Sequence, residues 1–390
     1  MRCLFKNAKV LLEERAKDTC VLTVGSKIGL VADHIDAPED ALVIDANGAY
    51  LSPGFVDIHV HGGGGAGSMD GSARDIVTMA DAHVRYGTTT LLPTTWAAPI
   101  ADQIAAIDCV KEAQKMSCMA EIAGIHLEGP FLSPAQAGAQ QPENLLVPAK
   151  ADWRGLIDYW DGIRMMGVAP ELDGAFVLGE ALAARSIVAT AAHTDTTIDV
   201  MREAAKHGFS DITHLYSGCS GMIRVNGYRV PGVIEAGLLL DEYTVQVIAD
   251  GSHLPYDLLR LIYKCKGPDM IEIITDGLEF AAAELDEGTE YVQKNGMRVV
   301  YEDGVMKLPS RQSFAGSVAT LNRCVRTMTQ AGIPLAEAVR MASYNPAKRI
   351  GLGNRKGLVK EGYDADLILF DENINVSFVM SRGNIIRKEF

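Results

Sequence analysis

The sequence predicts an α/β protein, a (β/α)8 barrel of the TIM type joined to a small β-sandwich formed by both chain ends. Strand-like apolar runs alternate with helical patterns eight times between Pro53 and about Pro346. The first 50 and the last 40 residues instead contain short runs of β-forming residues separated by turns. A length of 390 residues suits one barrel of about 250 residues plus a smaller domain. We expect the sandwich in residues 1–52 and 355–390 and the barrel in residues 53–354.

The predicted barrel strands are eight short apolar runs. In chain order they are Val56–His61, Thr88–Pro93, Ile122–Leu127, Met165–Ala169, Ile187–His193, Asp211–Leu215, Thr244–Ala249 and Ile271–Thr275. Helical spacing of apolar residues between several of them predicts helices at Ser72–Arg85, Ile100–Met116, Gly174–Ala184, Asp199–His207 and Pro255–Lys264. Strands expected in the sandwich include Cys20–Val24, Ala41–Ile44, Ala365–Phe370 and Ser377–Met380.

Composition narrows the class of protein and its partners. Hydrophobic residues make up 48% and charged residues 22%, which excludes disorder as the main state. A net charge of −14 repels phosphate backbones, so we expect no nucleic-acid partner. No apolar run approaches the ~18 residues of a membrane span, and Met1–Lys17 lacks the pattern of a signal peptide. The seven cysteines are scattered and never spaced as C-x-x-C, which favours a reducing cytoplasm.

Polar residues at the carboxyl ends of the predicted strands are the candidate site, because barrel enzymes place their active sites there. In the first strand, His59 and His61 share one face, and two histidines at this spacing favour a metal pair over a packed core residue. The further candidates at strand ends are His126, Glu128, His193, His214, His253 and Asp276. The remaining histidines, His34, His83 and His207, are expected in loops or on helix surfaces.

The residue types in this cluster point to metal-assisted hydrolysis. Imidazole nitrogens and carboxylate oxygens together suit Zn or Fe(II) rather than Mg or Ca. A metal at a barrel mouth most often activates water, because it lowers the pKa of bound water towards ~7. Asp276 is then the natural proton carrier, and the alternative is a strand-end aspartate that caps a loop. The run Gly62–Gly65 lacks the Gly-Lys-Ser/Thr of a phosphate loop and is expected to be a flexible loop near the site.

Several motifs resemble a known family. Pro53–His61 and Gly362–Phe370 resemble the amidohydrolase superfamily. Within it, His126-Leu-Glu-Gly-Pro-Phe-Leu-Ser-Pro134 is similar to the N-acetylglucosamine-6-phosphate deacetylases. The same family pattern continues at Ala169–Glu171, Ala192–Thr194, Thr213–Leu215, Ile248–Gly251, Thr275–Asp276 and Phe314–Ser317. The resemblance covers nearly the whole chain and implies a barrel with a small β-sandwich, a homodimer and hydrolysis of an N-acetyl amide.

The resemblance also implies a role for each matched residue. Glu128, His193 and His214 would hold the main metal. His59 and His61 would complete a second metal site, with Glu128 bridging the two. Asp276 would be the catalytic acid and base as well as a metal ligand. The expected cofactor is Zn or Fe, with one or two ions per subunit.

The residues that would recognise the substrate depart from the family pattern. Where the family has an aromatic residue followed by Asn and Ala, this chain has Tyr216–Cys219. Gln140 stands in place of a histidine. Of the family's His-His-Arg, only the arginine is present, as Arg229. The candidate substrate-binding residues are Gln140, Ser217, Gly218, Arg229 and His253. The resemblance implies that Arg229 reaches the site of a neighbouring subunit. The favoured substrate is N-acetylglucosamine 6-phosphate, and the alternatives are N-acetylgalactosamine 6-phosphate, another N-acyl amine or a cyclic amide. A barrel without catalytic activity is disfavoured, because the metal positions are intact.

Overall fold

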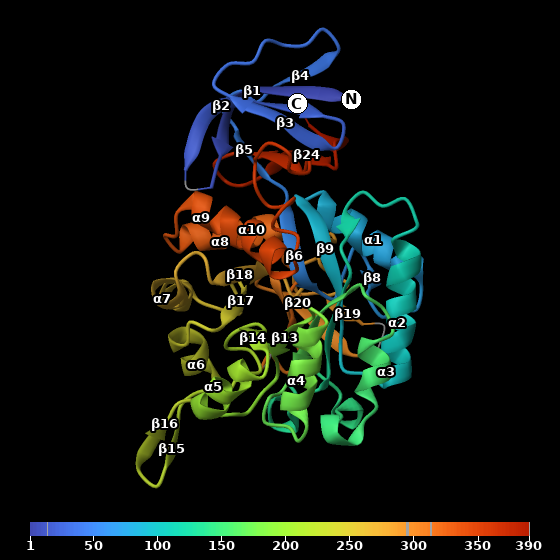
Figure 1. The fold of residues 1–390 in the computed structure, drawn as a ribbon, viewed down its shortest axis with the longest axis vertical. Helices are drawn as coiled ribbons and strands as arrows, with labels where there is room; N and C mark the ends of the chain where they lie inside the picture. The colour runs from blue at the N-terminus through green and yellow to red at the C-terminus, as the bar shows by residue number, and fades with distance from the viewer. Residues whose placement is uncertain (14, 294–295, 313, 390) are drawn as a thin grey trace.

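The predicted barrel is present in a computed structural model, which describes residues 1–13, 15–293, 296–312 and 314–389 (Figure 1). Its eight strands are β6 (Phe55–Val60), β9 (Thr88–Thr95), β11 (Ile125–Phe131), β12 (Ile163–Val168), β13 (Val188–Ala191), β14 (Phe209–Ile212), β17 (Thr244–Ile248) and β18 (Ile271–Ile274). Each strand pairs in parallel with the next. A parallel bridge between Val60 and Gly277 closes the ring. The predicted fold class is therefore confirmed.

The third barrel strand differs from its prediction. A separate short strand, β10 (Glu121–Ile122), pairs with β9, and β11 starts only at Ile125. The strand then continues through Gly129 and Pro130 to Phe131, four residues beyond its predicted end at Leu127. The ladder tolerates the proline because its register shifts between Glu128 and Phe131.

The five predicted helices are all present, and each starts within one residue of its prediction. They are α1 (Ala73–Val84), α2 (Ile100–Ala113), α4 (Ala175–Ala184), α5 (Ile198–Lys206) and α7 (Tyr256–Lys266). Ser72 explains where α1 begins, because its side chain accepts a hydrogen bond from the Asp75 amide. The other helices are α3 (Trp153–Ile157), α6 (Val233–Leu239), α8 (Leu321–Gln330), α9 (Leu335–Met341) and α10 (Tyr344–Arg349), with 3-10 turns at Pro134–Gln136, Pro142–Asn144 and Pro148–Lys150.

Packing of α1 against the glycine run corrects two predictions. His83 is fully buried rather than on the surface, and its Nε2 lies 2.9 Å from the Gly62 carbonyl. The run at Gly62–Gly65 is not a flexible loop but the turn of a short hairpin, β7 (Gly62–Gly63) and β8 (Ala66–Gly67). A Cβ at Gly63 would lie 2.6 Å from His83 Nε2, so glycine there permits close packing.

The second domain is built from both chain ends, which lie together at the top of Figure 1. Its strands are β1 (Arg2–Leu11), β2 (Ala16–Val24), β3 (Lys27–Ala32), β4 (Ala41–Asp45), β5 (Tyr50–Pro53), β23 (Leu367–Phe370), β24 (Val376–Ser381) and β25 (Asn384–Lys388). They form one continuous sheet, in which β5 pairs antiparallel with β23 and so joins the two ends. The sheet encloses its own core, where the rings of Phe5 and Phe378 meet edge to face at 5.4 Å.

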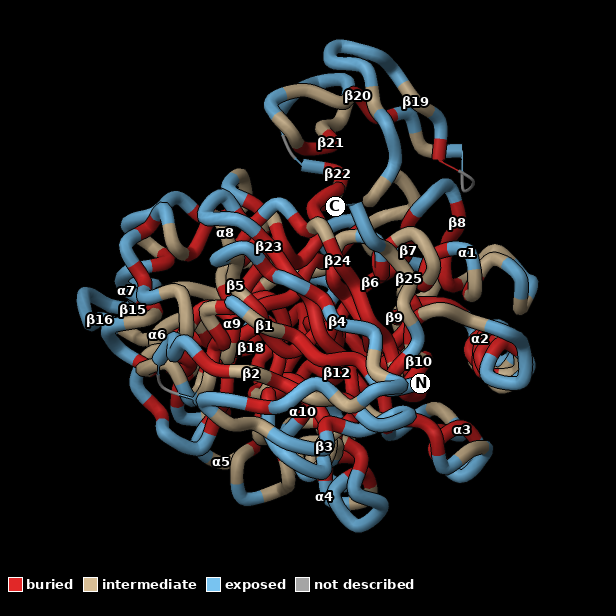
Figure 2. The backbone as a smooth tube through the Cα atoms, turned by 90° about the horizontal axis from the view of Figure 1, so that it is seen from above, coloured by how far each residue is buried: buried red, intermediate tan, exposed pale blue. Residues whose placement is uncertain are grey.

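Two small antiparallel units project from the barrel. One is the hairpin of β15 (Ile223–Val225) and β16 (Tyr228–Val230), at the lower left of Figure 1. The other is a lobe of β19 (Glu290–Val292), β20 (Arg298–Glu302), β21 (Val305–Lys307) and β22 (Phe314–Gly316), which stands clear of the buried barrel in Figure 2. Among the described residues, the helices are all too short or too polar to span a lipid bilayer.

A buried ion-pair cluster connects the sandwich to the barrel. The ammonium group of Lys356, whose side chain is 1% exposed, lies 2.5 Å from Asp366 Oδ2 and 2.9 Å from Glu121 Oε2. Glu121 belongs to the barrel strand β10, and Asp366 immediately precedes the sandwich strand β23. Lys356 therefore neutralises carboxylates from both domains at the same point.

We expect Lys356→Met to lower the free energy of unfolding by about 3 kcal/mol or more, because it leaves the buried Asp366 carboxylate without its cation and Glu121 with Arg355 alone. Urea unfolding followed by circular dichroism measures this loss. The control is Lys115→Met, at a lysine 69% exposed that pairs with Glu112. That variant should change stability by less than about 1 kcal/mol. Equal stability of the two variants would contradict a structural role for Lys356.

Candidate active site

Four histidines and two carboxylates converge at the carboxyl ends of the barrel strands. His59 lies in β6 and Glu128 in β11, and His61 directly follows β6. The other three lie two residues after a strand end, namely His193 after β13, His214 after β14 and Asp276 after β18. All are buried except Asp276, which is partly exposed. The three that follow β13, β14 and β18 have left-handed backbones, with φ of +43° at His193, +28° at His214 and +48° at Asp276. Such conformations are costly outside glycine and tend to cluster at functional sites.

Glu128 is the centre of this cluster. Its Oε1 lies 2.8 Å from His214 Nε2, 3.2 Å from His193 Nε2 and 3.5 Å from His59 Nε2. Its Oε2 lies 3.4 Å from His61 Nε2. One carboxylate therefore contacts all four imidazole rings, as a bridging ligand requires.

Asp276 lies beside the His59–His61 pair. Its Oδ1 is 3.1 Å from His61 Nε2 and 3.5 Å from His59 Nε2, and the two Nε2 atoms are 3.2 Å apart. Two sets of ligand atoms lie mutually within 4.8 Å, namely His59, Glu128 and His214, and His59, His61 and Asp276. His193 joins the first set through its contact with Glu128. The geometry thus brings together the residues of both predicted metal sites.

The outer ring nitrogen of each histidine contacts a hydrogen-bond acceptor. The pairs are His61 Nδ1 with Thr94 O (3.1 Å), His193 Nδ1 with Gln136 O (2.8 Å), His214 Nδ1 with Ser217 O (2.9 Å) and His59 Nδ1 with Gln246 Oε1 (3.0 Å). A carbonyl oxygen accepts only, so each Nδ1 carries a hydrogen, and each ring in its neutral form directs the lone pair of Nε2 into the cluster.

This donor set fits a divalent transition metal. Without a cation or a proton, the converging Nε2 lone pairs and carboxylate oxygens would repel one another. Nitrogen and oxygen ligands without thiolate are typical of catalytic Zn and Fe(II) sites. Both predicted sites meet this test, because each combines imidazoles with a carboxylate.

The charges of the cluster perturb its ionisation strongly. Burial lowers the pKa of His59 to about 4. Burial alone would lower the pKa of His61, but hydrogen bonds to Asp276 and Glu128 raise it to about 10. Burial alone would raise the pKa of Asp276, but the nearby His59 and His61 hold it below its usual value. Asp276 is therefore ionised at neutral pH and able to accept a proton.

His126 lies deeper in the barrel than the other strand-end histidines. It is near the start of β11, and its Nδ1 lies 3.0 Å from the Ile58 carbonyl. Its ring packs edge to face against His59, with centroids 4.7 Å apart. His126 thus supports a candidate ligand.

Three of the predicted substrate-binding residues lie against the cluster. The Gln140 amide donates to Glu128 Oε2 at 2.8 Å and accepts from the Ala97 amide at 2.7 Å. Ser217 supplies the carbonyl that contacts His214. Gly218 has φ of +58°, and a Cβ there would lie 2.8 Å from His193 Nδ1. Only glycine allows this loop to lie so close to the ring.

The other two predicted substrate residues are placed differently. His253 follows β17, its Nδ1 is 2.7 Å from Asp250 Oδ2, and its ring lies 5.0 Å from that of Phe314 in the lobe. Arg229 lies on the exposed hairpin strand β16, which projects beyond the barrel (Figure 1). The structure therefore does not bring Arg229 to the cluster of its own chain.

Sequence reasoning missed the acceptors behind the histidines. Thr94, Gln136 and Ser217 act through main-chain carbonyls, which leave no trace in the residue type. Gln246 does leave a signal, because it is a lone amide within the apolar run Thr244–Ile248. A polar side chain buried in a barrel strand requires a hydrogen-bond partner, and here the partner is His59.

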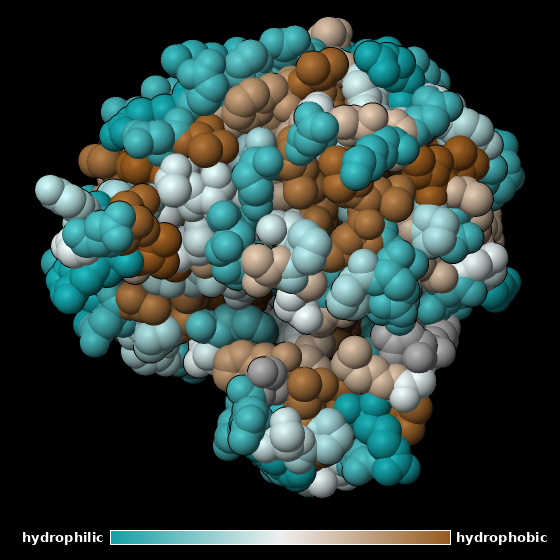
Figure 3. Space-filling model, turned by 90° about the horizontal axis from the view of Figure 1, so that it is seen from below, coloured by the Kyte–Doolittle hydropathy of each residue, from teal (hydrophilic) through white to brown (hydrophobic). Residues whose placement is uncertain are grey.

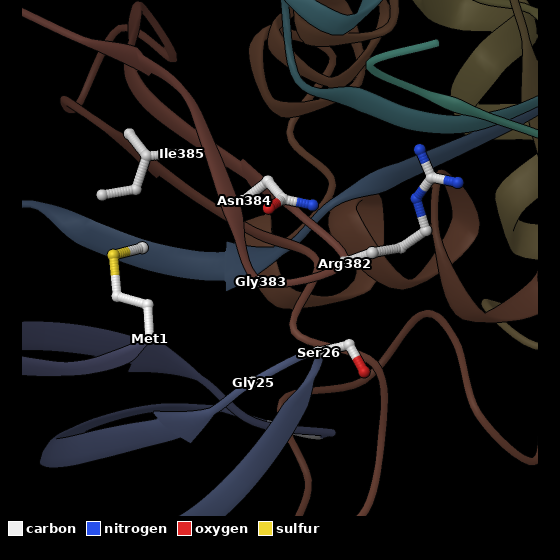
Figure 4. Close-up of a pocket in the computed structure, with 7 residues that line it drawn as sticks. All are labelled: Met1, Gly25, Ser26, Arg382, Gly383, Asn384 and Ile385. Carbon is white, nitrogen blue, oxygen red and sulfur yellow. The ribbon is translucent and has the colours of Figure 1, made fainter. Parts of the chain in front are cut away.

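A separate pocket lies in the sandwich and does not compete with this site. It is lined by Met1, Gly25, Ser26, Arg382, Gly383, Asn384 and Ile385 (Figure 4). Its one charged side chain, that of Arg382, donates to the Cys118 carbonyl at 2.7 Å. The pocket thus lacks the acid, base and ligand groups that the barrel cluster combines.

The barrel and its donor set define a metal-dependent hydrolase. Residues 50–386 match the amidohydrolase family, and the chain belongs to this family. The relatives place it among the N-acetylglucosamine-6-phosphate deacetylases. The enzyme of that name from Bacillus subtilis (strain 168) is 34% identical over 362 residues, which cover 90% of this chain and 86% of the relative.

Two further similarities bear on the substrate and the fold. The N-acetylgalactosamine-6-phosphate deacetylase of Escherichia coli O157:H7 is 29% identical over 361 residues, covering 91% of this chain and 93% of that protein. The crystal structure of N-acetylglucosamine-6-phosphate deacetylase from Pasteurella multocida superposes with a TM-score of 0.90. It is 28% identical and covers 99% of both chains.

Proposed function

We propose that the protein hydrolyses the N-acetyl amide of an amino-sugar phosphate, most simply N-acetylglucosamine 6-phosphate to glucosamine 6-phosphate and acetate. The observation that carries the proposal is the contact of one buried carboxylate, Glu128, with all four imidazoles beside the ionised Asp276. The relatives that are named N-acetylglucosamine-6-phosphate deacetylase support this choice of substrate.

The proposed cofactor is Zn or Fe, with one or two ions per subunit. Glu128, His193 and His214 would hold the main ion. His59 and His61 would hold a second ion that Glu128 bridges, with Asp276 as a further ligand. Such a metal, when bound, polarises the acetyl carbonyl and makes the attacking water more acidic.

Asp276 is the proposed acid and base. Its carboxylate is ionised at neutral pH and partly exposed, so it can take a proton from the attacking water. The same proton can then pass to the amine, which must be protonated to leave. One group serves both steps because the proton is taken in the first step and returned in the second.

The phosphate is proposed to meet groups on the rim of the site. Gly218 offers a main-chain N–H group and Ser217 a hydroxyl group, because the Ser217 amide already donates to the His214 carbonyl at 2.9 Å. His253 and Gln140 offer side-chain donors. Arg229 would complete this set from the neighbouring subunit of a homodimer.

The hairpin has the properties of a contact between subunits. Tyr228 is 78% exposed and Ile223 is 56% exposed. Hydrophobic side chains also show at the left edge of Figure 3, the side on which the hairpin lies. Arg224 and Arg229 lie directly opposite each other, and neither forms an ion pair with the described part of its own chain. Two facing cations are unfavourable unless an anion or a partner surface meets them.

N-acetylgalactosamine 6-phosphate is the second candidate substrate. The relative from Escherichia coli O157:H7 bears the name of that activity, and Gln140 and Ser217 depart from the family pattern where the sugar would be recognised. Another N-acyl amine or a cyclic amide would place the same hydrolytic groups in a different pocket. We also propose residues 1–52 and 355–390 as the supporting domain, residues 53–354 as the catalytic domain, and the cytoplasm as the location.

Acetate release from a panel of N-acetyl sugars tests the proposal. The panel holds N-acetylglucosamine, N-acetylgalactosamine, N-acetylmannosamine and their 6-phosphates. We expect kcat/KM to be highest for N-acetylglucosamine 6-phosphate. No acetate from any member, with metal supplied, would contradict the proposal.

Arg229→Ala should reduce kcat/KM for the phosphorylated sugar by roughly 10- to 100-fold, because charge-assisted hydrogen bonds contribute about 1.5–3 kcal/mol. Activity on the sugar without phosphate should stay the same, so the preference for phosphate largely disappears. The matched control is Arg224→Ala, the facing arginine. Gel filtration of both variants separates loss of phosphate recognition from loss of the dimer. An unchanged preference would mean that Arg229 is a solvated surface residue.

A further inference from the structure

His59 differs from the other three histidines in what supports it. His61, His193 and His214 each contact a main-chain carbonyl, whereas His59 contacts the side chain of Gln246. A main-chain carbonyl is fixed by the fold, but a side-chain acceptor must itself be held in place. The ring of His59 therefore depends on whatever orients Gln246.

A carboxylate fixes the orientation of the Gln246 amide. Gln246 Nε2 donates to Asp211 Oδ2 at 2.7 Å, and a carboxylate can only accept such a bond. The amide nitrogen is thus committed to Asp211, and the amide oxygen faces His59 Nδ1 at 3.0 Å. All three side chains are fully buried, so water does not compete. Nδ1 of His59 must carry the hydrogen, and Nε2 is left to bind a metal.

Asp211 is held in turn by neighbouring strands. Thr244 Oγ1 donates to Asp211 Oδ1 at 2.7 Å. Glu272 of β18 lies beside Asp211, and Arg349 of α10 donates to Glu272 Oε1 at 3.2 Å. Burial and the charge of Asp211 raise the pKa of Glu272 well above its usual value, which favours the protonated form and lessens repulsion between the two carboxyl groups. The chain of contacts runs from α10 at the outside of the barrel to the proposed second metal site.

We propose that Gln246 is a positioning residue that makes the site binuclear, by fixing the ring orientation and tautomer of His59. This inference rests on the proposed second metal site at His59, His61 and Asp276. The main site does not need Gln246, because Glu128, His193 and His214 are supported independently. Losing Gln246 should therefore remove one ion and spare the other.

Metal stoichiometry tests the proposal directly. The metal-free protein is titrated with Zn²⁺, and bound metal is measured by calorimetry and elemental analysis. We expect two ions in the unmodified protein. In Gln246→Leu, the first ion should bind unchanged, and the second should bind about 10- to 100-fold more weakly, the usual cost of losing such a supporting contact.

A reciprocal exchange provides the rescue. Gln246→Glu alone places a second carboxylate against Asp211 and should impair the second ion. Gln246→Glu combined with Asp211→Asn reverses donor and acceptor, so that the new carboxylate accepts from both His59 and the new amide. This double variant should recover the second ion. A purely structural role for Gln246 would show as lost thermal stability without a selective change in the second ion.

Tyr243→Phe is the matched control, because it removes a buried hydroxyl hydrogen bond, to the Met201 carbonyl, that involves neither Asp211 nor Gln246. It should lower the melting temperature slightly and leave both ions bound. If Gln246→Leu binds two ions with unchanged affinity, the inference about Gln246 is overturned, but the second metal site is not. A single ion in the unmodified protein would overturn both the second site and this inference, while acetate release would still support the proposed reaction. If Gln246→Leu does not fold, the test is the double variant Gln246→Glu, Asp211→Asn. If that protein folds but binds only one ion, the inference is overturned.

Discussion

Asp276→Asn is expected to lower kcat for deacetylation by roughly 10²–10⁴-fold while KM and the melting temperature change little. The amide keeps the size of the carboxylate and can still meet His61 Nε2, now 3.1 Å from Asp276 Oδ1. It cannot take a proton from water and return it to the amine. Steady-state acetate release gives kcat and KM, and circular dichroism monitors folding.

Metal content must be measured for the same variant, because Asp276 is also a candidate ligand. Unchanged stoichiometry with a low kcat would support the role as acid and base. The control is Asp195→Asn, at an exposed aspartate that accepts from Gln136 Nε2 at 2.9 Å without touching the imidazoles. That variant should retain activity within about twofold, since surface substitutions have small effects. Near-full turnover in Asp276→Asn would assign proton transfer to another group.

Glu128→Gln should have a larger effect, because it removes the ligand common to both proposed ions. The anionic oxygen within 2.8 to 3.5 Å of three Nε2 atoms is replaced by a neutral amide. We expect bound metal to fall below one ion per subunit and activity to fall by more than the roughly 10⁴-fold expected from loss of acid–base catalysis alone. Chelation of the unmodified protein should have the same effect, with activity restored by Zn²⁺ or Fe²⁺.

Glu171→Gln is the matched control for this substitution. Glu171 accepts hydrogen bonds from Thr194 Oγ1 and the Asp195 amide, next to the site but without an imidazole contact. It should retain metal and most activity. A Glu128→Gln protein that keeps its full metal content would show that the ions, if any, bind elsewhere.

The barrel could be predicted because its signal is local and repeated. Each apolar run is long enough to identify a strand, and Ser72 even places the start of α1. The lobe at Glu290–Gly316 and the hairpin at Ile223–Val230 were not predicted. Their strands have three to five residues, too few for a period to stand out, and their pairing depends on contacts across turns.

The candidate site was predictable to the level of which residues meet, but not of how they are held. Strand ends place His59, Glu128 and His214 at one mouth whatever their exact register. The supporting contacts are different, because a carbonyl such as Thr94 O can belong to any residue type. Burial of His83 was equally hidden, since it depends on glycine at position 63 allowing close approach. Arg229 shows a third limit, because a residue directed away from its own barrel can be understood only with a partner.

The pairing of β5 with β23 has a consequence for biosynthesis. The sandwich needs strands from both ends of the chain, and Pro53 and Leu367 are separated by the whole barrel. At translation rates of about 5–20 residues per second, the intervening segment of roughly 300 residues takes on the order of 15 to 60 s to emerge. During that interval the amino-terminal strands are outside the ribosome with an open edge at β5, which is prone to pairing with other chains. The barrel can begin to fold in the meantime, but its domain partner is completed only when the last strands are released.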